Sequence, residues 1–191
     1  RISTMTRIAG DPSSLPAHSI TSIHTDHYGN IWAGSIREGL IGISISRINT
    51  YSDVHIGLTT GLSNPTVLCL YEDRHSGHIW IGTDGEGLNR YDYTTHTFTH
   101  FSTTLRRKVV SIASYSESEL VISTYGDRIW IFDKNTGKIR PLKIHDKDLD
   151  YLIRYAGRGI NVMNEADGTI LIASNTIKRY DRVSGKCTVI G

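Results

Sequence analysis

The chain has 191 residues and a net charge of +2 at neutral pH, and 38% of its residues are hydrophobic, with 18 glycines. This length can bury a sizeable core, and abundant glycine suits an all-β protein rich in turns. The small charge favours no particular partner, and no apolar run approaches the roughly 18 residues of a membrane span. No segment resembles a signal peptide. Because the chain opens at Arg1 instead of a methionine, we expect a piece of a longer protein.

Residues 1–14 are expected to hold the outer strand of a preceding repeat, followed by a link. Met5 and Ile8 form an apolar pair three positions apart, and the same spacing recurs at Phe98 and Phe101, in the last extended run of a later unit. Residues 2–8 are therefore predicted to form a strand.

A unit of four short extended runs then occurs four times, in residues 15–51, 62–101, 105–142 and 151–190. The second unit is the clearest, with runs over residues 67–71, 78–83, 88–91 and 97–101. Turn residues separate these runs. Its second run, Ile79-Trp80-Ile81-Gly82, is apolar or small on both faces, so this strand should be covered on both sides.

Matched positions relate the four units to one another. Trp80 is matched by Trp32, Val121 and Leu171. Two positions later each unit has a small residue, at Gly34, Gly82, Ser123 and Ala173. The next position always carries a hydroxyl, at Ser35, Thr83, Thr124 and Ser174. The small side chain would let one sheet approach the next closely.

The spacing of the units predicts a β-propeller. Trp32 and Trp80 are 48 residues apart, and Trp80 and Val121 are 41 apart. A period of about 40–50 residues with four strands is the repeat of a propeller, in which four-stranded blades stack face to face. We therefore expect an all-β chain of about four blades. Common propellers close with more blades, so we expect an incomplete propeller, part of a ring of about seven. The remaining blades would come from the parent chain or through self-association.

No metal, cofactor or catalytic site is expected. Pairs of histidines three apart occur at His24 and His27 and at His75 and His78, but alternate positions of a strand point to opposite faces, and zinc needs three or four convergent ligands. The sequence contains neither a G-x-S-x-G elbow nor an H-E-x-x-H motif. The two cysteines read as small core residues without a disulfide. The basic triplet at residues 106–108 reads as a solvated link without nucleic-acid binding, since no aromatic patch accompanies it.

The turns between the second and third strands of the units are the predicted ligand-binding positions. In a propeller these turns emerge on the same face as the links between blades. They carry charged, polar and aromatic groups suited to hydrogen bonding and to stacking on a polyhydroxylated ligand. The candidates are Arg37, Glu38, Asp84, Glu86, Tyr125, Asp127 and Arg128.

The second unit resembles the regulator-propeller repeat found in the periplasmic sensor regions of hybrid two-component systems of gut-dwelling Gram-negative bacteria. The resemblance rests on Leu62-Ser-Asn-Pro-Thr-Val67, Glu72-Asp73, Gly77-His-Ile-Trp-Ile-Gly-Thr83 and Gly87-Leu-Asn-Arg-Tyr-Asp92. The first unit matches through Gly29-Asn-Ile-Trp32, Gly34 and Gly39-Leu40, and the third and fourth match in outline.

This resemblance implies a parent receptor anchored in the inner membrane, with a histidine kinase and a DNA-binding response regulator. The chain would be a non-catalytic part of its periplasmic ligand-sensing region, contacting neither membrane nor nucleic acid. Such sensors respond to oligosaccharides and control genes for glycan utilisation. Two alternatives stay open. Propeller lyases have similar G-x-I-W repeats, and a convergent His and Glu with bound magnesium would favour an enzyme. The chain could also be a structural or dimerisation module.

Overall fold

The computed structural model describes residues 4–11, 14–44, 48–51, 61–101, 107–147, 149–151 and 160–190. The strands of these segments form four separate four-stranded antiparallel sheets, each with its strands in sequence order. We call these sheets blades 1 to 4. The all-β propeller architecture expected from the repeat is confirmed.

The strand bounds follow the repeat. Blade 1 contains β1 (Ile20–Thr25), β2 (Ile31–Ser35), β3 (Leu40–Ile43) and β4 (Ile48–Tyr51). Blade 2 contains β5 (Val67–Asp73), β6 (His78–Thr83), β7 (Leu88–Asp92) and β8 (Thr97–His100). Blade 3 contains β9 (Val109–Ser114), β10 (Glu119–Thr124), β11 (Ile129–Asp133) and β12 (Ile139–Pro141). Blade 4 contains β13 (Asn161–Asn164), β14 (Ile170–Ala173), β15 (Ile177–Tyr180) and β16 (Cys187–Val189).

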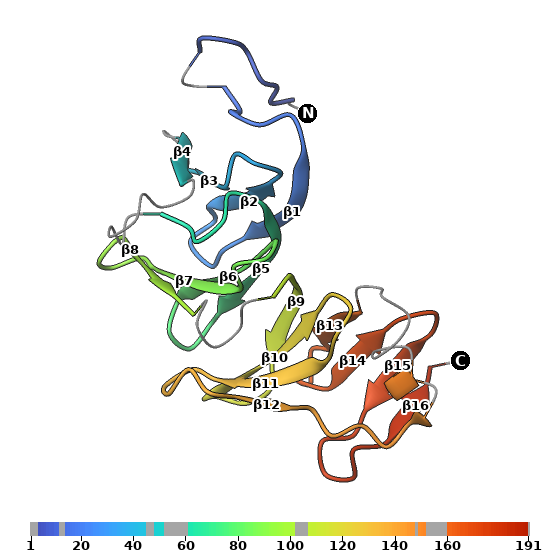
Figure 1. Ribbon diagram of the computed structural model, residues 1–191. Helices are drawn as coiled ribbons and strands as arrows, with labels where there is room; N and C mark the ends of the chain where they lie inside the picture. The colour runs from blue at the N-terminus through green and yellow to red at the C-terminus, as the bar shows by residue number, and fades with distance from the viewer. Residues whose placement is uncertain are drawn as a thin grey trace.

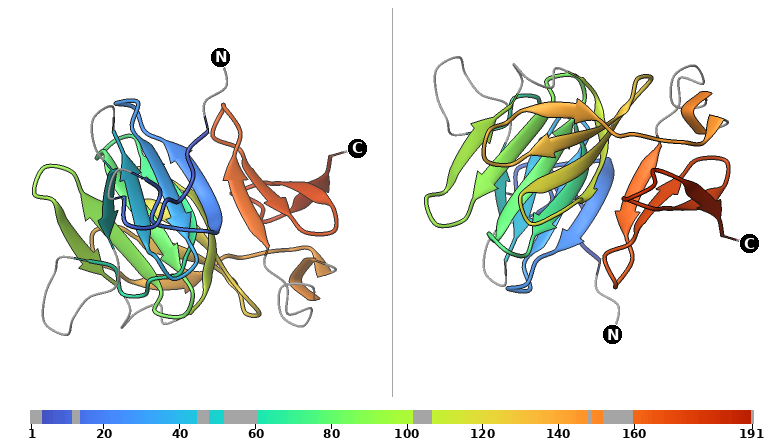
Figure 2. Two further views of the ribbon diagram at one scale, coloured as in Figure 1. Left: turned by 90° about the horizontal axis from the view of Figure 1, so that it is seen from above. Right: turned by 90° about the horizontal axis from the view of Figure 1, so that it is seen from below.

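The four blades form an open arc (Figure 1). Their first strands are neighbours in the order β1, β5, β9 and β13, so these strands line the inner side of the arc and the fourth strands lie outside. Two further views show the blades from above and below (Figure 2). Blade 1 and blade 4 therefore each have one face without a neighbouring blade.

The hydrophobic core lies between the blades. Trp32 of blade 1 packs with Ile79 and Ile81 of blade 2, whereas Trp80, on the opposite face of the same β6 strand, packs with Ile122 of blade 3. Successive residues of β6 thus serve two different interfaces, because neighbouring side chains of a strand point to opposite faces. This explains why the second run of the repeat is apolar on both faces.

The small residue of the second strand sits where two sheets approach closely. A Cβ on Gly82 would lie 2.5 Å from Cys69 Sγ and 2.7 Å from the carbonyl oxygen of Val109, the first residue of blade 3. A Cβ on Gly34 would lie 2.5 Å from Cγ1 of Val67, the first residue of blade 2. The expected role of this position in blade stacking is confirmed. Both cysteines are free thiols.

Residues 4–11 contain no strand, so the outer strand expected over residues 2–8 is not seen in this segment. An outer strand forms hydrogen bonds to the third strand of its own blade, and the described part of the chain has no such strand paired with these residues. Positions 2 and 3 fall outside the described residues.

Candidate functional site

The meander of each blade gives the arc two different faces. Turns between second and third strands lie at one end of the strands, which we call the upper face. Turns joining the first strand to the second, and the third to the fourth, lie at the other end, the lower face. All seven predicted ligand-binding residues lie on upper-face turns, in residues 36–39, 84–87 and 125–128.

The recurring hydroxyl of the second strand holds these upper turns in shape. Ser35 Oγ donates to the Gly39 carbonyl at 2.9 Å, and Thr83 Oγ1 donates to the Gly87 carbonyl at 2.8 Å. Thr124 Oγ1 donates to the carbonyl of Arg128 at 2.9 Å. Each hydroxyl closes a loop of the same length. The turns of blades 1 to 3 are therefore built alike and present their tips in equivalent places.

Two ion pairs order the upper face of blades 2 and 3. Lys108 Nζ lies 2.7 Å from Asp84 Oδ1 and ties the start of blade 3 to the upper turn of blade 2. Arg107 Nη1 lies 2.8 Å from Asp127 Oδ2, and its guanidinium lies 5.7 Å from the centre of the Trp130 ring. The sequence predicts only a solvated link for these cations, whereas the structure pairs both with carboxylates of the upper face. Both cations come directly before the first strand of blade 3, and the links between blades emerge on the upper face. This position could have indicated that they lie near the upper turns.

The remaining candidates lie on the same face, but their side chains form no ion pair with Arg107 or Lys108 within the segments that the structure describes. The Tyr125 side chain is 53% exposed beside the ion-paired Asp127. Glu86 accepts a hydrogen bond at its backbone carbonyl from Ser63 Oγ, at 3.2 Å. Arg37 and Glu38 are exposed on blade 1, and no hydrogen bond or ion pair joins them to blades 2 and 3 in the described part of the chain. The structure thus brings Asp84, Tyr125 and Asp127 together with Arg107 and Lys108.

A buried carboxylate joins blades 1 and 2 on the lower face. Asp26 accepts hydrogen bonds from Trp32 Nε1 at 2.8 Å, from the Tyr93 hydroxyl, and from the backbone amides of Tyr28 and Asn30, each at 2.9 Å. Burial on its own would raise the pKa of Asp26, but the hydrogen bonds from Tyr93, Trp32 and Asn30 outweigh it and lower the pKa to about 2. Asp26 is therefore ionised and structural.

The histidines of the first turn bind a second carboxylate. Glu72 Oε2 lies 3.2 Å from His24 Nε2, and Glu72 Oε1 lies 2.5 Å from His27 Nδ1. Burial favours a raised pKa for Glu72, but hydrogen bonds from His27 and His24 lower it. Both carboxylate oxygens are thereby occupied. The described residues contain no group of three or more ligands placed to hold a metal ion.

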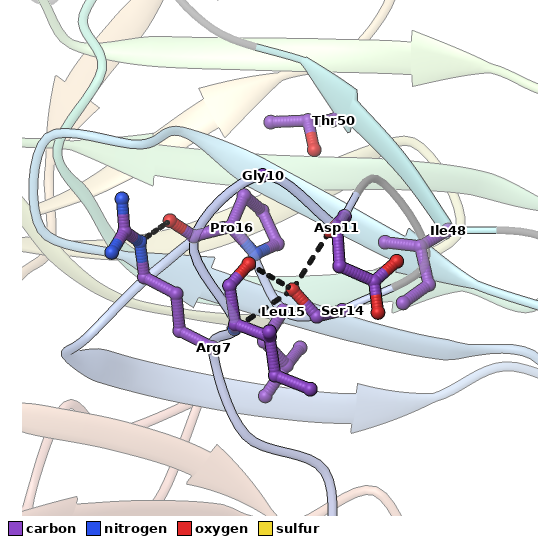
Figure 3. A pocket seen from close by; sticks show the side chains of 9 residues that line it. Arg7, Gly10, Asp11, Ser14, Leu15, Pro16, Ile48 and Thr50 are labelled. Carbon is purple, nitrogen blue, oxygen red and sulfur yellow. Dashed lines mark hydrogen bonds between the residues drawn. The ribbon is translucent and has the colours of Figure 1, made fainter.

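A hollow lies beside the N-terminal segment (Figure 3). Its volume is about 650 Å³, and it lies between residues 7–11 and 14–16 and β4 of blade 1. Ser14 Oγ accepts from the Ile8 amide at 2.9 Å, and Arg7 Nε donates to the Pro16 carbonyl at 3.3 Å, so the polar groups drawn there serve the segment itself. This hollow opens at the uncovered side of blade 1.

Comparison with protein families identifies the repeat. A family model described as the two-component regulator propeller matches residues 14–37 and 61–85, which are the starts of blades 1 and 2. These two segments match the regulator-propeller repeat. A search of curated proteins gives no significant match.

Solved structures share the fold of these regulator-propeller repeats. An extracellular domain of a protein described as a hybrid two-component system of B. thetaiotaomicron aligns with a TM-score of 0.66 and 24% identity, covering 95% of this chain and 25% of that one. Virginiamycin B lyase from Staphylococcus aureus aligns with a TM-score of 0.67 and 17% identity, covering 93% and 57%. The chain therefore spans about a quarter of the length of that extracellular domain. At these identities, the likeness establishes the β-propeller fold.

No helix in the described segments is both long enough and apolar enough to cross a membrane.

Proposed function

We propose that this chain is part of the periplasmic ligand-sensing region of a hybrid two-component receptor, anchored in the inner membrane through its parent protein. The match of two blades to the two-component regulator propeller supports this assignment. The chain itself would be non-catalytic, and the kinase and the DNA-binding response regulator would lie elsewhere in the parent.

We further propose that the receptor detects an oligosaccharide on the upper face of blades 2 and 3 and controls genes for glycan utilisation. The observation that carries this proposal is the ordered set of charges around an exposed ring, with Asp84 and Asp127 held by Lys108 and Arg107 beside Tyr125. Fixed donors and acceptors suit sugar hydroxyls, and an exposed aromatic ring suits the apolar face of a sugar.

Ligand binding on the upper face would change how blades 2 and 3 pack against each other. The Asp84–Lys108 pair already joins two blades, so a ligand that contacts both sides of it changes the free energy of their relative placement. A ligand shifts such an equilibrium only by its difference in affinity for the two arrangements. The remaining blades and domains of the parent would carry this bias to the kinase.

The test is thermal-shift screening of the full-length protein that contains this chain against a panel of oligosaccharides, with calorimetry on any hit. Stabilisation by one sugar class, lost in Asp84→Asn and Tyr125→Ala but kept in Glu117→Gln on the lower face, supports the proposal. Absence of a shift with every sugar overturns it and leaves a structural or dimerisation module. Turnover of a candidate overturns it in favour of a lyase-like enzyme.

A further inference from the structure

Every pair of neighbouring blades repeats the same arrangement at its lower outer edge. One position is the last residue of the first strand or the residue directly after it, at Asp26, Asp73 and Tyr115. A second follows the aromatic-Asp pair of the next blade, at Tyr93, Lys134 and Arg182. A third lies on or just after the fourth strand, at Tyr51, Phe101 and Leu142. The three blade pairs can therefore be compared position by position.

The first two blade pairs each hold a carboxylate at this edge whose oxygens are bound by partners from both blades. Between blades 1 and 2, Asp26 is bound by Trp32 and Tyr93. Between blades 2 and 3, Lys134 Nζ lies 2.8 Å from Asp73 Oδ2, with side chains only 11% and 5% exposed. There the Phe101 ring packs on Phe132 with centroids 5.0 Å apart and fills the space between the blades.

The third pair has lost both features. Tyr115 stands where Asp26 and Asp73 supply a carboxylate, and Leu142 stands where Phe101 fills the edge. Arg182 lies over the Tyr115 ring, 5.3 Å from its centroid, and donates to the backbone carbonyls of Tyr115 and Gly168. A pocket of about 190 Å³ opens here, between blades 3 and 4.

The pocket is lined by cations that lack carboxylate partners. Lys143 and Arg182 form no ion pair with any described residue, whereas Arg140 is paired with Glu119 at 2.9 Å. His145 Nδ1 donates to the Ser184 carbonyl at 2.7 Å, which fixes the ring at the pocket wall. With Arg140 paired to Glu119, Lys143 and Arg182 are the two cations of the pocket lining that have no carboxylate partner among the described residues.

We propose that this pocket binds an oxyanion group, the carboxylate or sulfate of an acidic saccharide. Two of the five N–H donors of Arg182 are used by backbone carbonyls, which fix the guanidinium and leave donors for the oxygens of a carboxylate or a sulfate. Lys143 supplies the second charge. The anion site stands on the geometry alone, while the assignment of its ligand to a saccharide rests on the proposed sensing function.

The test is calorimetric titration of the full-length protein with glucuronate, inorganic sulfate and neutral glucose. We expect both anions to bind and glucose not to compete with them. Arg182→Gln and Lys143→Gln should each weaken anion binding about tenfold, the worth of one charge-assisted hydrogen bond. Tyr115→Asp should do the same by supplying the carboxylate that Lys134 has in the preceding pair. Lys138→Gln removes an exposed charge of blade 3 outside the pocket and should leave binding unchanged.

The outcomes separate the site from its ligand. Anion binding that persists unchanged in Arg182→Gln and Lys143→Gln overturns the site, as does the absence of anion binding. Binding of sulfate without glucuronate overturns the saccharide assignment and leaves a site for inorganic anions. Lys143 is exposed, so its substitution keeps the test valid if Tyr115→Asp fails to fold. Failure of the upper-face proposal would appear instead in the Asp84 and Tyr125 variants with neutral sugars.

Discussion

Single side chains at the lower edge form hydrogen bonds and ion pairs that join neighbouring blades. Asp26 is 96% buried, since only 4% of it is exposed, and it joins β1 and β2 of its own blade to Tyr93 of the next. An ionised carboxylate in such a place is stabilised by hydrogen bonds to its charged form, which lower its pKa below the value of an unfolded chain. Its contribution to stability must therefore depend on pH.

Asp26→Asn should destabilise the chain at neutral pH and not at pH 2. The pKa of Asp26 is about 2 in the folded protein against 3.8 for an ordinary aspartate. A lowered pKa adds stability above pH 3.8, about 2 kcal/mol here, which is lost as the pH falls to about 2. Denaturant unfolding of the wild type and the variant at several pH values measures the gap, which is the difference between their free energies of unfolding.

The gap should be largest at neutral pH and should close in acid. Glu117→Gln, which removes an exposed carboxyl from the lower turn of blade 3, should follow the wild-type profile. A gap that stays constant between pH 7 and pH 2 would show that Asp26 acts through its shape and not through its charge.

At the scale of strands and blades, the packing distance is set by one position of the second strand. Gly82→Ala should destabilise the chain by about 1–3 kcal/mol, the usual cost of overpacking a core. The added methyl would meet Cys69 and the backbone of Val109, which cannot both move without opening the interface between blades 2 and 3. Ser123→Ala, at the matched position of blade 3, keeps a Cβ that the structure already accommodates.

Urea unfolding of these two variants shows whether Gly82→Ala loses stability through packing between the blades or through a local change in the backbone. A loss of stability for Gly82→Ala well above that for Ser123→Ala supports the packing explanation. Equal losses would contradict it, since they would not depend on whether a Cβ already fits.

The same scale shows what could be predicted from sequence. Strand positions follow from local alternation, and the small residue, the hydroxyl and the upper turns follow from matching units, so the blades and the face of the seven candidates were predictable. The lower-edge contacts were not. Asp26 and Tyr93 are 67 residues apart, and Asp73 and Lys134 are 61 apart, so their meeting depends on how blades stack. The pairing of Lys108 with Asp84 was missed for the same reason, because it crosses from one blade to the next.

At the scale of the whole molecule, the open arc leaves apolar side chains on its end faces. Ile23 on β1 is 72% exposed and points away from blade 2, since the adjacent His24 is the residue that faces Glu72. Met163 on β13 is 53% exposed and points away from blade 3, because the adjacent Val162 belongs to the core shared with that blade. In a closed propeller both faces are covered by further blades.

We therefore expect the 191-residue chain to self-associate when it is studied alone. Sedimentation velocity over a range of concentrations should show species larger than a monomer, and the double variant Ile23→Lys and Met163→Lys should shift the distribution toward the monomer. Tyr125→Lys changes a ring of the same exposed fraction as Met163 on the upper face and should leave association unchanged. A wild-type chain that stays monomeric at every concentration would contradict this prediction, because it would show that the exposed end faces do not drive association. Further blades would then be needed for ligand sensing and not for the stability of these four.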